Sequence, residues 1–408
     1  MAMSTEAPRA GHVLPRAWLG LLGILVVAGA AAWIYQLAHG LSATGMRDVV
    51  SWGMYIFTFA FLVGLSAGGL IMASAAEVFG VEALKPLRRL GVLTAAACVA
   101  VAAVLILPDL GRPDRVINLF IHPNWRSPLI WDLLIISVYF AFAVVDLWVM
   151  TRQKIDPTKQ ARTLRVLAYI GLPTAVLLHS ITAWIFGLQI ARTWWNTALL
   201  APIFIASAIV SGTAFVVLIS LLLHRYGGVE LPERTWRWLT GLLAAGIAVD
   251  LFFVACDYIT IIWGNVPRQR AALDVILPGG SWQWLFWVEW VVGGIVPFLL
   301  LVIPSLRRRF GVIGVASVLV MLGVFAYRIE LVGAGLVRPL IQLPPGTSIG
   351  TQAPGAPNFQ FQGLYHPTWV EYTITVGILA LLALLVTLGY RWLHVFGREK
   401  VGVPGDGD

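Results

Sequence analysis

Residues 52–81 read WGMYIFTFAFLVGLSAGGLIMASAAEVFGV, and Glu77 is the only charged residue among them. An α-helix needs about 20 mostly apolar residues to cross the hydrocarbon core of a bilayer, which is roughly 30 Å thick. This stretch is longer than that, and its small residues at 64–69 are typical of close contacts between membrane helices. We therefore expect residues 52–81 to form a membrane-spanning helix.

Comparable apolar runs recur along the whole chain. Hydrophobic residues make up 59% of its 408 residues and charged residues only 12%, about half of the share in soluble domains. The ten predicted spans are 17–39, 52–81, 90–108, 128–151, 163–189, 196–224, 236–263, 282–304, 311–334 and 369–395. This pattern predicts an all-α integral membrane protein and excludes a secreted disulfide scaffold, a nucleic-acid-binding protein and a disordered chain. We expect a single polytopic domain over 1–408, embedded at about 17–395.

The distribution of Lys and Arg predicts the orientation of these spans. Nineteen of the 28 basic residues lie in the two tails, in the even-numbered connections or in the parts of the spans nearest to them, and nine lie in or toward the odd-numbered connections. Basic residues concentrate on the cytoplasmic side of membrane proteins, so we expect the tails 1–16 and 396–408 in the cytoplasm. The outer connections 109–127, 264–281 and 335–368 are longer and rich in Pro, Gly, Asn and Gln, which is typical of a docking platform, and we expect the last of them to be irregular.

A weak internal symmetry also appears. Spans 2 and 6 carry small-residue clusters at 64–69 and 207–212, and spans 4 and 8 carry the carboxylates Asp132 and Glu289. We predict two four-helix bundles in parallel repeat, spans 2–5 and 6–9, flanked by spans 1 and 10. The alternative is that small residues simply recur where membrane helices touch.

Eight of the 20 acidic residues fall inside the predicted spans. They are Glu77, Asp132, Asp146, Asp250, Asp257, Glu289, Glu330 and Glu371. A carboxylate at the centre of a membrane helix costs roughly 2.5–3.5 kcal/mol, so eight of them indicate a function or a specific pairing. Two have a structural alternative: Glu330 can form an ion pair with Arg328, and Glu371 stands at a helix start that favours negative charge.

The spacing of some of these acids suits a proton path. Asp250 and Asp257 are seven residues apart and share one helix face, about 10 Å from each other. Asp132 and Asp146 are fourteen apart, about 21 Å along their helix. We assign Asp250, Asp146 and Glu77 to such a path, and a polar seam between helices is the alternative.

Histidine and cysteine usage bears on cofactors. Only His179 lies well inside a span, whereas a b-type haem needs paired axial histidines. The two cysteines, Cys98 and Cys256, are fewer than the roughly four thiolates of an iron–sulfur cluster. We therefore expect neither haem nor iron–sulfur cluster in this chain, and no metal site.

Several strings occur in a characteristic order. They are WGMYI at 52–56, DLGRPDR at 109–115, SPLIWD at 127–132 with Ser137 and Tyr139, and WNTALLAP at 195–202 with Ser207-Ala208 and Ser211-Gly212. In these strings the chain resembles the NrfD/PsrC family of quinone-reactive membrane subunits. The ten-helix members, in alternative complex III, sulfur-metabolism complexes and hydrogenases, are more similar to it than the eight-helix type.

This resemblance implies a function. Such a subunit binds an exchangeable quinone, menaquinone or ubiquinone, near the outer face of the bacterial cytoplasmic (inner) membrane. It exchanges electrons there with a ferredoxin-like iron–sulfur subunit. A further catalytic subunit, which is a molybdopterin enzyme, a multihaem cytochrome or a hydrogenase, carries the terminal chemistry.

We expect the quinone site where polar side chains meet at similar depth. His179, Asp257 and Asp132 are the predicted catalytic and quinone-binding residues, since imidazole and carboxyl groups can bond a quinone carbonyl and exchange protons near neutral pH. Tyr139, Tyr55 and Tyr258 are the predicted neighbours in the same cavity.

Charges on the sparsely basic outer side suggest a docking surface. The connection 109–127 holds Arg112 and Arg115 together with Asp109, and we predict that these three contact the partner subunit. The alternative is that charges in this connection pair among themselves.

Two other classes of function remain open from the sequence. A secondary transporter also combines repeats with carboxylates at mid-membrane depth, and a membrane anchor without quinone chemistry needs only the spans. Obvious Gly/Pro breaks at mid-membrane are missing, which disfavours the transporter, and the eight membrane acids disfavour the anchor.

Overall fold

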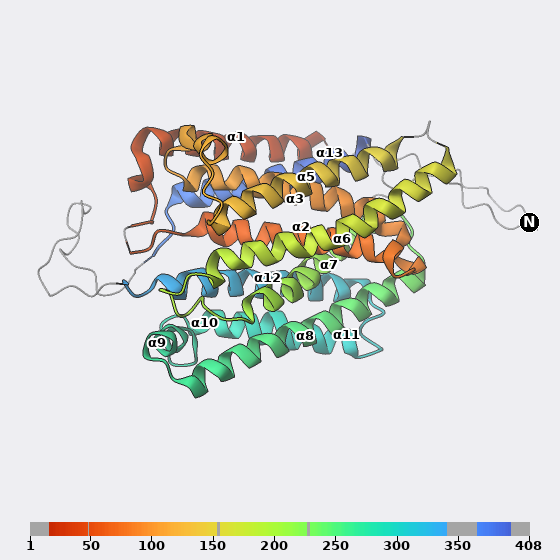
Figure 1. Cartoon of the computed structure of the whole chain (residues 1–408). Helices are drawn as coiled ribbons and strands as arrows, with labels where there is room; N and C mark the ends of the chain where they lie inside the picture. The colour runs from red at the N-terminus through yellow and green to blue at the C-terminus, as the bar shows by residue number, and fades with distance from the viewer. Residues whose placement is uncertain (1–15, 48, 153–155, 227–228, 341–364, 393–408) are drawn as a thin grey trace, which may run out of the picture.

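The computed structural model describes residues 16–47, 49–152, 156–226, 229–340 and 365–392. Every regular element within these ranges is helical (Figure 1). The elements are α1 (Arg16–His39), η1 (Gly40–Ala43), α2 (Met54–Val78), η2 (Glu82–Leu87), α3 (Arg88–Asp109), η3 (Pro113–Arg115), α4 (Asn118–Ile121), α5 (Pro128–Thr151), α6 (Pro157–Gly187), α7 (Leu200–Tyr226), α8 (Glu233–Gly264), α9 (Pro267–Ile276), α10 (Gln283–Phe286), η4 (Trp287–Ile295), α11 (Val296–Val302), α12 (Phe310–Leu336) and α13 (Trp369–Trp392).

Ten helical stretches are long and apolar enough to cross a membrane. They coincide with the ten predicted spans, so the prediction of a multi-pass, all-α membrane protein is confirmed. The largest difference at a helix start is in α6, which begins six residues before the predicted 163. The Asp156 carboxylate explains this start, because it accepts hydrogen bonds from the backbone N–H groups of Thr158 and Lys159 at 2.8 and 3.1 Å.

The eighth span differs from the uniform helix that its hydropathy predicts. It is built from α10, the π-helical stretch η4 and α11 in direct succession. A π-turn places one extra residue in each turn, and it often marks a functional site. Apolar periodicity carries no signal for this change of helix type.

Two outer connections contain more structure than their composition predicts. The connection 264–281 includes the helix α9, and 109–127 includes η3 and α4. Of the third connection, 335–368, the segment 341–364 lies outside the described residues.

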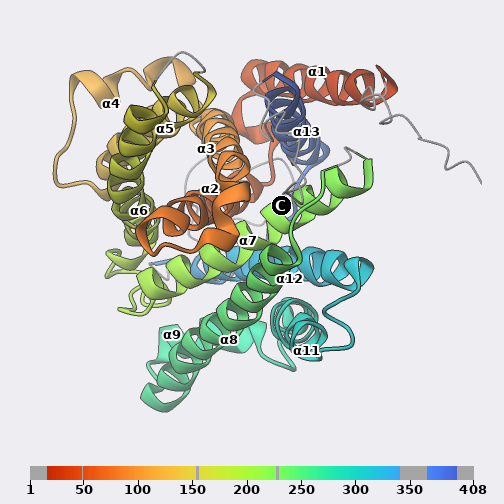
Figure 2. The same cartoon turned by 90° about the vertical axis from the view of Figure 1, so that its right-hand side faces the viewer.

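For description we divide the helices into two groups, which contact each other through α2 and α7 (Figure 2). In one group α2 packs on α3 and α6, and α5 packs on α3 and α6. In the other, α7 packs on α8 and α12, and α11 packs on α8 and α12. Helices α1 and α13 lie side by side, and α13 rests on α3. A repeat relation between the two groups stays a prediction.

Glycine permits the close approach of α2 and α7. A Cβ atom added to Gly212 of α7 would lie 2.6 Å from the Cα of Gly68 of α2, which is closer than atoms in contact can approach. Backbone contacts of this kind pack membrane helices tightly where a hydrophobic driving force between helices is missing. The small-residue clusters of the sequence therefore serve the contact between the two groups.

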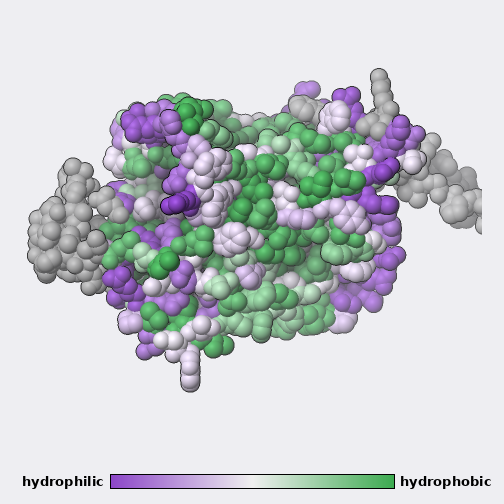
Figure 3. All heavy atoms as spheres, in the orientation of Figure 1, coloured by the Kyte–Doolittle hydropathy of each residue, from purple (hydrophilic) through white to green (hydrophobic). Residues whose placement is uncertain are grey.

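The surface agrees with a membrane location. Apolar side chains form a broad band between two polar ends in Figure 3. The predicted outer end, as the term is used below, carries the α3–α5, α6–α7 and α8–α10 connections and is the left end in Figure 1. The N-in/C-in orientation itself stays a prediction from the basic residues.

Candidate functional site

Helix α6 places a histidine where it packs against α2 and α7. The His179 side chain is fully buried, and a Cβ atom added to Gly64 of α2 would lie 3.5 Å from its Cε1 atom. The Phe204 ring of α7 is 5.2 Å away, measured between ring centroids. Neither imidazole nitrogen forms a hydrogen bond with the described residues. Because buried polar atoms are nearly always hydrogen-bonded, these two nitrogens are candidates for contact with a ligand.

Asp132 of α5 lies beside the same face of α6. Its carboxylate is 3% exposed and accepts a hydrogen bond of 2.6 Å from the Thr182 hydroxyl. Thr182 is three residues after His179, and residues at this spacing are neighbours on a helix surface, about 5–6 Å apart at Cβ. The structure therefore places Asp132 and His179 in one region without direct contact.

Asp257 of α8 occupies a separate position. It accepts a 2.7 Å hydrogen bond from the hydroxyl of Thr197, which precedes α7. Phe204, the neighbour of His179, is four residues into α7, which is roughly 6 Å further from the predicted outer end than the start of this helix. No hydrogen bond or ion pair within the described ranges joins Asp257 to Asp132 or His179. The structure thus groups two of the three predicted catalytic residues and holds the third nearer the predicted outer end.

The predicted tyrosine neighbours already have partners in the protein. Tyr139 donates a 2.8 Å hydrogen bond to the backbone carbonyl of Ser66 on α2. Tyr55 donates a 2.6 Å hydrogen bond to the side chain of Gln36 on α1, near the predicted outer end of α2. Both hydroxyls tie helices together, so a role in ligand binding would require them to exchange these partners.

Tyr258 points away from Asp257, its neighbour in the chain, toward two other acids. Its hydroxyl donates a 2.7 Å hydrogen bond to Glu330 of α12 and lies 3.4 Å from Glu289 of η4. All three side chains are buried. Nothing in the sequence indicates that Glu289 and Glu330 meet, because residues 41 positions apart reveal their proximity only in the folded chain.

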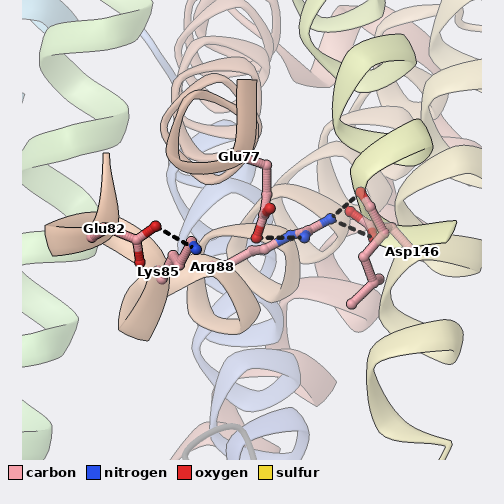
Figure 4. A network of polar contacts seen from close by, with 6 residues as sticks. Glu77, Glu82, Lys85, Arg88 and Asp146 are labelled. Atoms are coloured by element: carbon pink, nitrogen blue, oxygen red, sulfur yellow. Dashed lines mark hydrogen bonds and ion pairs between the residues drawn. The ribbon is translucent and has the colours of Figure 1, made fainter. Parts of the chain in front are cut away.

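Two of the three predicted proton-path acids are bound by one arginine (Figure 4). The Arg88 guanidinium at the start of α3 lies 3.1 Å from Glu77 of α2 and 3.4 Å from Asp146 of α5. It also donates a 2.7 Å hydrogen bond to the carbonyl of Leu164 on α6. This arginine therefore links all four helices of the first group at the end opposite the predicted outer end. The third acid, Asp250, has one buried carboxyl oxygen without a hydrogen-bond partner in the described part of the chain.

Of the three predicted docking residues, two are exposed at the surface and one is directed into the protein. Arg112 forms a two-point ion pair with exposed Asp114, at 2.9 and 2.8 Å, and this hydrogen bonding lowers the pKa of the Asp114 carboxyl. Arg115 is exposed. Asp109 has one buried, unpaired carboxyl oxygen and so faces inward. The pairing alternative thus holds for Arg112 and Asp114, and the exposed pair is still accessible to a partner.

An aromatic cluster near the predicted outer end was not assigned from the sequence. Trp52 stacks on Trp195 with ring centroids 5.6 Å apart, and Phe186 of α6 packs edge-on against both. The Trp195 indole N–H donates a 2.6 Å hydrogen bond to the carbonyl of Leu331 on α12. Both tryptophans stand in the motif strings, but single aromatics at helix ends are so common in membrane proteins that they indicate no shared site.

The described residues contain no group of three His, Cys, Asp or Glu side chains arranged to hold a metal ion. Imidazole, carboxyl and hydroxyl groups such as those of His179, Asp132 and Thr182 can form hydrogen bonds and, in the first two cases, transfer protons.

Comparison with known proteins gives a consistent result. The sequence family described as polysulphide reductase, NrfD matches residues 42–339. A Halobacterium salinarum protein, provisionally named as a membrane subunit of dimethyl sulfoxide reductase, is 40% identical over 399 residues, covering 93% of this chain and 91% of the relative. A selenate reductase subunit of Mesobacillus selenatarsenatis is 24% identical, with coverage of 95% and 96%. The integral membrane subunit of menaquinone reductase from Nitratidesulfovibrio vulgaris is 23% identical, with coverage of 94% and 92%.

Proposed function

Because the chain belongs to the polysulphide reductase, NrfD family, we propose that it is the quinone-reactive membrane subunit of a multi-subunit respiratory oxidoreductase. The observation that carries this proposal is His179, a fully buried imidazole beside the Asp132–Thr182 pair whose two nitrogens form no hydrogen bond with any residue that the structure describes. The relative that is named as a menaquinone reductase subunit supports a quinone substrate.

The geometry suits the two-electron, two-proton chemistry of a quinone. Reduction to the quinol adds one proton to each carbonyl oxygen, and oxidation removes them. His179 can bond one carbonyl and transfer a proton through a ring nitrogen. Asp132 can take up or release a proton while the Thr182 hydroxyl holds its carboxyl group in place. The bilayer and the surrounding helices exclude bulk water from this exchange.

The stacked aromatics Trp52 and Trp195 lie on the predicted outer side of His179, with Phe186 of α6 packed edge-on against both. We place the path of the quinone ring along this cluster, since aromatic faces bind planar rings by offset stacking. Asp257, held by Thr197 closer to that end, then serves to exchange protons with the outside.

The partner subunits follow from the same proposal. Relatives are named as subunits of selenate and menaquinone reductases, so the terminal chemistry belongs to another chain, which we take to be a molybdopterin enzyme, a multihaem cytochrome or a hydrogenase. A ferredoxin-like iron–sulfur subunit at the predicted outer end would connect that chain with the quinone. We place the assembly in the bacterial cytoplasmic membrane.

Asp257→Asn tests the proposed function. Asparagine keeps the shape and can still accept the Thr197 hydrogen bond, but it cannot carry a proton. We expect quinone-linked turnover of the intact complex to fall at least about 100-fold, the lower range for the loss of a general acid–base group. Binding of a fluorescent hydroxyquinoline N-oxide quinol analogue should change little.

The matched control is Asp274→Asn. Asp274 lies on α9 near the same end of the molecule, is 53% exposed at its side chain and pairs with Arg270. Its variant should turn over like the wild type. Wild-type turnover by an assembled Asp257→Asn complex would remove Asp257 from the proposed proton exchange.

Charge reversal at Arg112 and Arg115 tests the docking surface. A negative patch in place of these exposed arginines should reduce the recovery of the iron–sulfur subunit in a detergent pull-down several-fold, because complementary charge guides such contacts. Reversal of Arg307 and Arg308, exposed residues at the opposite end, is the control. Full recovery after reversal of both Arg112 and Arg115 would rule out the docking role.

A further inference from the structure

The second helix group holds an acidic pair that the proposed quinone chemistry does not use. Glu289 of η4 and Glu330 of α12 are 7% and 0% exposed, and both carboxyl groups face the hydroxyl of Tyr258. The Tyr258 hydroxyl lies within 2.7 Å of Glu330 and 3.4 Å of Glu289. A tyrosine has a single proton to donate, so it satisfies one of the two carboxyls. Two negative charges at this separation in a membrane interior would repel strongly, and one shared proton removes that repulsion.

A buried arginine provides an independent observation beside this pair. Arg328 is fully buried, and its Nε and Nη1 atoms have no hydrogen-bond partners among the described residues. Its Nη2 atom donates a 2.6 Å hydrogen bond to Ser207 of α7. Asp250 and Glu289 lie close enough for their charges to act on the guanidinium. A buried cation with two free donors beside an acidic pair is costly unless negative charge remains nearby.

The ion pair between Arg328 and Glu330 that the sequence allowed is not formed within the described ranges, as Arg328 bonds Ser207 and Glu330 bonds Tyr258. Residues two apart point to different sides of a helix, which explains the separation. Arg328 instead faces α7, with its guanidinium 3.9 Å from the centroid of the Phe204 ring. Phe204 is also in contact with His179, so one aromatic ring lies between the proposed quinone site and the arginine.

The helix that carries Glu289 is itself unusual. The carboxylate belongs to the π-helical stretch η4, and Gly293 of that stretch is in backbone contact with Gly323 of α12. A π-turn shifts the side chains that follow relative to a regular α-helix, and such turns cluster at functional sites. This places Glu289 against α12, where it meets Glu330.

We infer that Glu289, Glu330 and Tyr258 form a proton-holding site, separate from the quinone site, which binds one exchangeable proton between the two carboxyls. A proton that arrives converts one carboxylate to the neutral acid, and a proton that leaves restores the charge, so the step involves no redox change. The positive charge of Arg328 stabilises the deprotonated form of the pair. Because Arg328 lies between the pair and His179, a change of charge at His179 alters the proton affinity of the pair through space. This last coupling rests on the proposed function, whereas the proton-holding pair does not.

The charged and titratable side chains that surround the pair come from two helices. They are Asp250 and Tyr258 of α8, and Tyr327 and Arg328 of α12.

The first experiment needs neither quinone nor partners. Infrared difference spectra of the full chain in detergent, recorded between acidic and alkaline pH, should contain a C=O stretching band from a protonated carboxyl group shielded from water. Glu289→Gln and Glu330→Gln should each remove this band, because either change destroys the shared pair. Glu233→Gln, at an exposed side chain, should leave it intact. A band that persists in both variants would overturn the inference.

The second experiment separates the inference from the proposed function. In proteoliposomes that contain the intact complex, Glu330→Gln should keep at least half of the quinone-linked turnover and lose most of the proton movement that accompanies each quinol. Unchanged proton movement per quinol would refute the coupling. Wild-type turnover in a His179→Ala complex would refute the quinone site instead, and the infrared result would still decide the proton-holding pair.

Discussion

Quinone-linked turnover should fall at least about 100-fold when His179 is replaced by alanine, since a positioned acid–base group contributes 10²–10⁴-fold. The protein should still insert and assemble, because the imidazole makes no hydrogen bond with the described residues that would be lost. The hydroxyquinoline N-oxide analogue should bind more weakly, because its ring substituents lose a hydrogen-bond partner. Turnover of the purified complex and analogue fluorescence in detergent measure the two effects.

His224→Ala is the matched control for this experiment. His224 lies at the last turn of α7, and its ring bonds the backbone carbonyl of Val229, at the end opposite the predicted outer end. It should retain wild-type turnover. If the His179 variant assembled and matched the wild type in both rate and analogue binding, the quinone would have to bind elsewhere.

The second large effect concerns stability. Arg88→Met should reduce the free energy of unfolding by about 3–5 kcal/mol, the cost of leaving a buried carboxylate without its partner. Asp146 is 2% exposed at its side chain and has Arg88 as its ion-pair partner, whereas Glu77 is 20% exposed and can reach water more easily. Reversible unfolding in mixed detergent micelles measures the change.

Lys85→Met and a double variant are the controls. Lys85 pairs with Glu82 just before α3, in the same view of Figure 4, but both side chains are exposed, at 43% and 63%. Surface substitutions of this kind usually change stability by no more than about 0.5 kcal/mol. The double variant Arg88→Met with Asp146→Asn should recover part of the lost stability, because it leaves no buried charge at Asp146. Equal stability losses for Arg88→Met and Lys85→Met would show that the buried ion pairs contribute little.

Arg88 also shows where sequence reasoning about a membrane protein ends. In the charge count it is one of the basic residues between two spans, and it contributes to the predicted orientation. In the folded chain it is the first residue of α3 and reaches two acids on two other helices. The sequence indicates the depth of a charged residue in the bilayer. The direction of its side chain depends on how the neighbouring helices are rotated about their axes and packed against it.

The candidate site shows the same division. His179 could be selected from the sequence because a histidine well inside an apolar span is conspicuous, and Asp132 because a carboxylate there is costly. Their proximity through Thr182 could not, because threonine is common in membrane helices and carries no signal by itself. The separate place of Asp257 and the meeting of Glu289 with Glu330 depend on the rotation of α8, η4 and α12 about their axes, which similar depth does not determine.

The sequence by itself determined the ten spans and the family. Crossing a bilayer is a local requirement, since each helix must satisfy its own backbone and present apolar side chains over about 20 residues. The tertiary structure alone decided which helices touch, where the π-turn lies and which polar groups pair. These features depend on the close contact of Gly68 with Gly212 and on side chains from distant parts of the chain. Interactions between helices arise only after the spans are inserted, so the hydropathy of the sequence does not predict them.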